Sequence, residues 1–273
     1  GGLFLLMAAG CLWPRVTPAL ALASGTAFSL LWGNPLPRWS SAWSKRLLQI
    51  AVIGLGFGVG LPQVLREGAQ SLVYTVPAIA LALGAGWWLG RRLRVEGNTA
   101  HLISFGTAIC GGSAIAALAP ALKAGNEETA VSLATVFTLN AAALLLFPVF
   151  GRLLEMDQPA FGLWAALAIH DTSSVVGAAA AFGDEALRTA TIVKLTRTLW
   201  IAPCVLAFAW LRHSGRRVAV PLFIVGFLAA ALASSALPGQ AGLWAALARG
   251  ARRLLTATLF FIGAGLTREV LRH

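Results

Sequence analysis

The chain has 273 residues, of which 58% are hydrophobic and only 11% are charged. This composition excludes a water-soluble globular domain and is typical of an integral membrane protein. The formal net charge of +11 would suit nucleic acid, but most basic residues lie in short clusters between apolar runs, as the positive-inside rule produces. We therefore expect a lipid bilayer around the protein and no nucleic-acid partner.

Apolar runs of about 17–25 residues are long enough to cross a bilayer. The chain has candidate runs near residues 16–33, 46–65, 70–90, 127–150, 186–211, 218–237 and 252–268, with a shorter run at 3–13. Two further segments, 100–122 and 160–182, are apolar but rich in glycine and polar residues. Together they predict an all-α, multi-pass membrane domain over residues 1–273, with about 8–10 transmembrane elements.

Basic residues gather in four clusters that we expect to be loops. We expect the protein in the inner membrane of the cell. If the transmembrane elements alternate in direction, the first three clusters lie on one side of this membrane, which we assign to the cytoplasm. The fourth falls on the other side. The clusters are Arg38/Lys45/Arg46, Arg91/Arg92/Arg94, Arg212/Arg216/Arg217 and Arg249/Arg252/Arg253.

The segment from Gly106 to Ala117 reads Gly-Thr-Ala-Ile-Cys-Gly-Gly-Ser-Ala-Ile-Ala-Ala. Non-helical backbone is tolerated at membrane depth only where it is buried in protein or lines a polar cavity. A helix that restarts near Ser113 would point free N–H groups at an anion. The segment therefore predicts a broken helix and a substrate site that contains Thr107, Cys110, Gly111, Gly112 and Ser113.

A second interruption runs from Ala168 to Ser174. His170 could exchange a proton in the physiological range and Asp171 could tune it; the alternative is a structural His–Asp pair that holds the break open. Thr172, Ser173 and Ser174 could donate hydrogen bonds to an oxyanion, or cap the helix that follows.

Lys194 and Arg197 lie in an apolar run and share a helix face. A charge at membrane depth is costly, so it faces protein or a polar cavity by default. The alternative is that the two side chains snorkel to an interface. Anion coordination by these two cations is the interpretation that we favour.

The chain also repeats itself. Arg46-Leu-Leu, Gly56 and Gly58 recur as Arg253-Leu-Leu, Gly263 and Gly265, and Ala108-Ile109, Ser113 and Gly125 recur as Ala168-Ile169, Ser173 and Gly183. Such matches indicate the internal, inverted repeats of many secondary transporters. If the two broken segments are re-entrant hairpins, both pairs are inverted; if they span, one pair is parallel.

The Gly106–Ala114 motif, the Ile169-His-Asp segment and Ala190-Thr-Ile-Val-Lys-Leu-Thr-Arg197 resemble the signatures of the YeiH-like sulfate exporter family, over almost the whole chain. The family belongs to the cation–proton antiporter and anion transporter superfamily. The resemblance implies a core with two crossed discontinuous segments (about 100–211), a scaffold (about 1–90 and 218–273), elevator-like alternating access and a homodimer. The family usually has glutamate and glutamine where this chain has Asp171 and Ser174.

These observations predict a secondary transporter for a small anion such as sulfate, a sulfonate or a carboxylate. His170 and Asp171 would couple it to a proton or sodium ion. One alternative is a cation–proton antiporter with Asp171 as the cation ligand; another is a non-transporting scaffold or sensor. We expect no enzyme activity, metal or cofactor, because no Ser–His or metal-binding set has a workable spacing.

Overall fold

The computed structural model describes residues 2–95, 97–201, 203–204 and 222–266. Every regular element within these ranges is a helix, so the expected all-α fold is confirmed. The chain divides into two compact units, and each is described by itself. Unit 1 contains residues 1–66, 179–188 and 221–273, and unit 2 contains residues 67–178 and 189–220. Whether these units act as scaffold and core stays a prediction.

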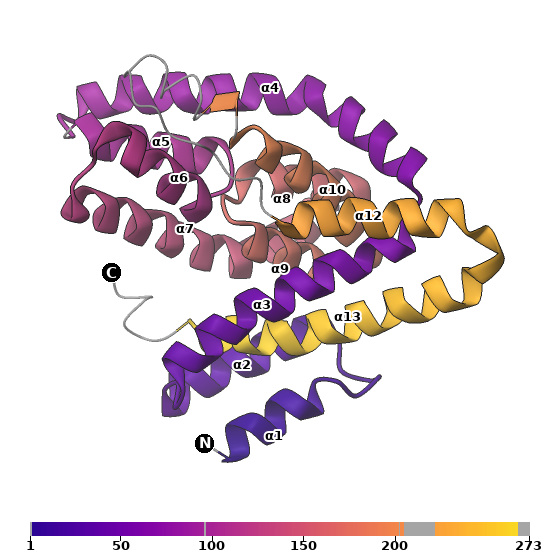
Figure 1. Ribbon diagram of the computed structural model, residues 1–273. Helices are drawn as coiled ribbons and strands as arrows, with labels where there is room; N and C mark the ends of the chain where they lie inside the picture. Colours follow the sequence, from indigo (N-terminus) through magenta and orange to yellow (C-terminus); the bar gives the residue numbers. More distant parts are fainter. Residues whose placement is uncertain (1, 96, 202, 205–221, 267–273) are drawn as a thin grey trace. The chain divides into compact units, whose positions relative to one another are not determined.

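Unit 1 is built around α13 (Ala241–Ala264), which packs against α2 (Pro18–Trp32) and α3 (Pro37–Leu55) (Figure 1). Glycines allow the close approach, because a Cβ at Gly25 would collide with the carbonyl of Phe260. Small residues at such contacts are a common means of packing helices in membranes.

The remaining helices of unit 1 cover this centre. α12 (Leu222–Ala236) packs against α3, and α1 (Gly2–Gly10) contacts α13. From α1, the ring of Phe4 lies 5.2 Å from that of Phe260 and 5.4 Å from that of Phe28. The 3-10 turn η2 (Pro238–Gln240) joins α12 and α13, which are bent by 98° relative to each other.

The first long helix after α3 differs from expectation. The sequence predicts spans at 46–65 and 70–90, but α3 ends at Leu55, η1 (Gly56–Gly58) follows, and α4 runs unbroken from Leu61 to Arg92. The glycine-rich stretch breaks the helix because glycine disfavours helical backbone. Between the two expected spans, Arg66 and Glu67 are good helix formers and continue α4.

Two expected basic loops are also wrong. Arg38, Lys45 and Arg46 lie within α3, and Arg249, Arg252 and Arg253 lie within α13, since arginine and lysine favour helices. Of the second cluster, Arg91 and Arg92 end α4 and Arg94 follows it. The third cluster (Arg212, Arg216, Arg217) lies outside the described residues.

Unit 2 contains most of α4 and two successive groups of three helices. The first group is α5 (Gly97–Ala108), α6 (Gly112–Leu122) and α7 (Asn126–Leu153). The second group is α8 (Gln158–Ala168), α9 (Thr172–Phe182) and α10 (Asp184–Leu199). Both α9 and α10 have one end in unit 1 and the other in unit 2. The breaks fall sixty residues apart, since α5 ends at 108 and α8 at 168, and α6 starts at 112 and α9 at 172. The repeat proposed from sequence therefore exists at the level of elements.

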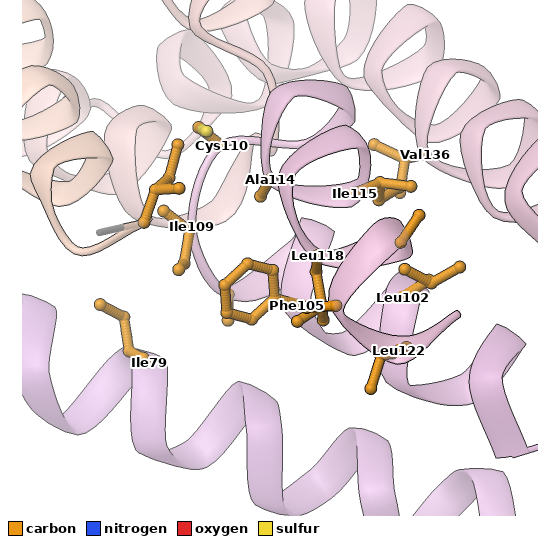
Figure 2. Packing of buried hydrophobic residues seen from close by; sticks show 14 residues of the cluster. Ile79, Leu102, Phe105, Ile109, Cys110, Ala114, Ile115, Leu118, Leu122 and Val136 are labelled. Carbon is orange, nitrogen blue, oxygen red and sulfur yellow. The ribbon is translucent and has the colours of Figure 1, made fainter. Parts of the chain in front are cut away.

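The core of unit 2 fills the space between α5 and α6. Leu102 and Phe105 from α5 and Ile115 and Leu118 from α6 have no exposed surface, and Figure 2 shows them in one cluster with Val136 of α7. A Cβ at Gly106 would meet Ile115, so the two helices lie against each other on either side of the break. The first broken segment thus folds back on itself.

Two described helices, α4 and α7, are long and apolar enough to cross a bilayer, and the bent α12–α13 pair would make a third. α2, α6 and α9 are apolar but shorter. The breaks explain the shortness of α6 and α9, because each break divides an apolar segment of span length into two half-helices.

Candidate functional site

The two helix breaks of unit 2, residues 108–112 and 168–172, together with Asn140, Lys194 and Arg197, form what we call the break site. In the first break the backbone turns at Gly111, whose φ is +68°. The Gly111 N–H donates to the carbonyl of Gly106 at 2.8 Å, which closes the end of α5. Only glycine adopts this left-handed region at little cost.

Gly111 is the N-cap of α6 and has no side chain with which to bind the first N–H groups of that helix. Among the described residues, the N–H groups of Gly112 and Ser113 have no recorded partner. Cys110 is buried, and its thiol interacts with the N–H of Ala114. The start of α6 therefore presents two free backbone donors.

The second break is closed by side chains. Asp171 caps α9: its Oδ2 accepts from the N–H of Ser173 at 2.9 Å and from that of Ser174 at 3.3 Å. Asn140 of α7 bridges to the same break, where its Oδ1 accepts from the N–H groups of His170 (3.1 Å) and Asp171 (3.2 Å). The N–H of Thr172 has no recorded partner within the described residues.

The two breaks touch. An added Cβ at Gly111 would lie 3.4 Å from both the Cα and the N of Asp171. It would also lie 3.3 Å from a methyl group of Val136. The site at which α5 gives way to α6 is therefore adjacent to the site at which α8 gives way to α9.

Lys194 and Arg197 of α10 are almost completely buried, at 0% and 2% exposure. The Lys194 ammonium donates to the carbonyls of Ile169 (2.7 Å) and Ala166 (3.3 Å) at the end of α8. Arg197 joins both broken segments: Nε donates to Ala108 O (2.6 Å), Nη2 to Thr107 O (3.2 Å) and Nη1 to Leu167 O (2.5 Å).

These bonds place both cations at the negative ends of two helix dipoles, where positive charge is stabilising. Ion pairs recorded within the described residues join Arg188 to Glu185 and Arg252 to Asp184, so neither Lys194 nor Arg197 has a carboxylate partner there. Snorkelling to an interface does not describe these buried side chains, which donate to backbone carbonyls inside the protein. The cations hold the two helix ends together and leave the surroundings positively charged.

The structure thus gathers the residues that the sequence singled out. Thr107, Cys110, Gly111, Gly112 and Ser113 lie at the first break, and His170, Asp171, Thr172, Ser173 and Ser174 at the second. Lys194 and Arg197 reach the breaks through carbonyl groups. Asn140, which the sequence analysis left out of the site, belongs to it; an asparagine in the middle of an apolar helix was the available signal.

Two buried polar atoms at the break site have no hydrogen-bond partner among the described residues: Asn140 Nδ2 and His170 Nδ1. Buried polar atoms of native proteins are nearly always paired with protein, water or ligand. Within the same ranges, no three His, Cys, Asp or Glu side chains come together as a metal site. The unpaired atoms therefore indicate a place for water or a polar ligand.

Comparison with known proteins gives consistent relationships. The family described as conserved hypothetical protein 698 matches residues 39–272. A UPF0324 membrane protein of Geobacter sulfurreducens is 52% identical over 100% of this chain and 88% of its own length. A UPF0324 membrane protein of Bacteroides thetaiotaomicron is 48% identical over 94% of this chain and 79% of its own length. No solved structure matches the chain.

Proposed function

We propose that this chain, which belongs to the UPF0324 family of membrane proteins, is a secondary active transporter that moves a small anion across the bacterial inner membrane. The observation that carries the proposal is a pair of buried cations without a carboxylate partner among the described residues, beside two helix starts with free N–H groups. Sulfate, a sulfonate or a carboxylate would each supply oxygens for those donors.

The balance of charge favours an anion. Two formal positive charges, on Lys194 and Arg197, stand against one carboxylate, that of Asp171. The negative ends of α5 and α8 are offset by the positive ends of α6 and α9, since each helix end carries about half a charge. A bound cation would meet net repulsion, and Asp171 Oδ2 already accepts two N–H bonds.

Broken helices at mid-membrane depth are a recurrent way to bind ions in transporters, with helix N-termini directed at anionic groups. In this proposal the N–H groups of Gly112, Ser113 and Thr172 bind the anion. His170 supplies the coupling step, because its unpaired, buried Nδ1 can accept a proton as the anion enters.

The decisive experiment removes one backbone donor and little else. Thr172 is the first residue of α9, where proline is tolerated because the N–H makes no helical bond. Thr172→Pro deletes that N–H, whereas Thr172→Val removes only the hydroxyl and is the matched control. Purified variants are reconstituted in liposomes, and flux of labelled sulfate, a sulfonate and a carboxylate is measured with and without a proton gradient.

We expect flux of one of these anions in the wild type, a loss of about ten-fold or more in Thr172→Pro, and near wild-type flux in Thr172→Val, as one lost hydrogen bond to a charged group predicts. Equal flux in the two variants would show that the Thr172 N–H at the start of α9 does not bind the anion. Activity that depends on a sodium gradient, without flux of any tested anion, would favour a cation–proton antiporter instead.

A further inference from the structure

Unit 1 contains a cavity of about 370 Å³ that the proposed transport function does not use. Ligand sites in proteins commonly have volumes of about 300–1,000 Å³, so this one suits a ligand larger than a simple ion. Its wall combines the segment before α2, the junction of α9 with α10, and one face of α13. All of its lining residues lie within unit 1.

Three arginines of α13 dominate the charge of this cavity: Arg249, Arg252 and Arg253. Residues three and four apart share a helix face, so all three project to the same side. Among the described residues of the lining, Asp184 is the only one with a carboxylate. The cavity is therefore strongly positive.

The pairing within the cavity leaves most of this charge available. Arg252 Nη1 lies 2.7 Å from Asp184 Oδ2, and both side chains are exposed, at 46% and 79%. Exposed ion pairs contribute little to stability, so a competing anion can displace this one. Among the described residues, Arg249 and Arg253 have no recorded hydrogen bond or ion pair.

The rest of the wall is mostly apolar, with Thr17 and Thr256 as its polar side chains. Leu187 and Leu255 contribute side chains that are almost completely buried, and Pro14 and Val16 contribute the opposite edge. Guanidinium groups bind phosphate oxygens in a bidentate manner, and basic pockets between membrane helices bind anionic lipid headgroups. An apolar wall beside three arginines suits a phosphate ester with a carbon chain better than a free ion.

We propose that this cavity binds a phosphate group, carried by an anionic lipid headgroup or supplied as free phosphate, at a site separate from the break site. Arg249 and Arg253 hold the phosphate oxygens, and Arg252 exchanges Asp184 for the ligand. The apolar wall receives the first carbons of the ester.

The test measures binding to the purified full chain in a neutral detergent, with three probes: short-chain phosphatidic acid, short-chain phosphatidylcholine and inorganic phosphate. Binding is followed by titration and by the shift in melting temperature. The variant is Arg249→Gln with Arg253→Gln. The matched control is Arg38→Gln with Arg46→Gln, which removes two exposed arginines of α3 that do not line the cavity.

We expect phosphatidic acid to bind and stabilise the wild type and the control pair, and the cavity variant to bind about ten-fold or more weakly, as the loss of two charged donors predicts. Asp184→Asn, which removes the competing carboxylate, should bind more tightly than wild type; this opposite change does not depend on the fold of the double variant. Phosphatidylcholine should bind more weakly than phosphatidic acid.

Stabilisation by inorganic phosphate with the same dependence on Arg249 and Arg253 would identify free phosphate as the source of the ligand. Equal binding of phosphatidic acid by the wild type and the cavity variant, or no response to either phosphate probe, would overturn the proposal. Anion flux through the break site is measured separately, so either proposal can fail without the other.

Discussion

The two helix breaks of unit 2 occupy equivalent places in the repeat but are built by different chemistry. At the first break, backbone alone makes the turn, since Gly111 adopts a positive φ and leaves the start of α6 uncapped. At the second, Asp171 caps α9 and Asn140 of a neighbouring helix binds the turn. The same architecture therefore does not require the same residues.

The difference indicates that the two repeats of unit 2 contribute different groups to the break site. Among the described residues, the glycine break has no side-chain cap and two N–H donors without a recorded partner, while the Asp171 break has a side-chain cap and one such donor. Arg197, from the second half only, donates to the ends of both α5 and α8. One asymmetric residue thus holds together two related segments, and the predictions below test this comparison.

The largest effect is expected for Arg197→Ala, which would separate the two breaks. It leaves three carbonyls without their donor, a buried one at Ala108 and half-buried ones at Thr107 and Leu167. Each such group costs about 1–3 kcal/mol, so a loss of at least about 3 kcal/mol in unfolding free energy follows. Chemical denaturation in detergent measures it. Arg188→Ala on the same helix removes a partly exposed arginine in an exposed ion pair with Glu185 and should cost less than about 1 kcal/mol.

Gly111→Ala tests the break that depends on backbone. A positive φ in a non-glycine residue costs about 1–3 kcal/mol, and the new methyl group also presses on Asp171 and Val136. We expect a clearly lower melting temperature. Gly84→Ala is the matched control: Gly84 lies within α4 with open space around it, and the change should stabilise by about 0.5–1 kcal/mol. Equal effects from the two variants would contradict the role of Gly111.

Asn140→Leu tests the break that depends on side chains. The N–H groups of His170 and Asp171 lose their acceptor inside the protein, at a cost of about 2 kcal/mol. Thr135→Val removes a hydroxyl of the same helix that donates to the carbonyl of Val131 in an exposed bond, and should change stability by less than about 0.5 kcal/mol. Hydrogen exchange at residues 169–172 should rise in Asn140→Leu alone.

The smallest effects concern the cap of α9. Asp171→Ala should cost about 1 kcal/mol, while Asp171→Asn should be nearly neutral, because asparagine is an equally good N-cap. Thermal melting of the two variants gives the stability difference. If Asp171 also takes part in proton coupling, Asp171→Asn keeps its stability and loses the response of anion flux to a proton gradient; an unchanged response would make Asp171 a structural residue only.

Much of the fold follows from the sequence through properties that act locally. Apolar runs identify helices for the membrane, glycines at 106, 111 and 112 identify the first break, and the internal matches identify the repeat. The expected loops at Lys45 and at Arg252 failed for the same local reason, since a charge marks either a loop or an exposed helical face, and spacing alone does not distinguish them.

What the sequence by itself determined is a helical membrane protein with two broken segments and two cations within an apolar helix. Only the tertiary structure decided the partners of those cations. Lys194 and Arg197 bind carbonyl groups at helix ends 25 to 90 residues away, and Asn140 joins the site across about thirty residues. Every residue has the same backbone carbonyl, so the sequence alone does not identify which carbonyl groups a buried cation binds.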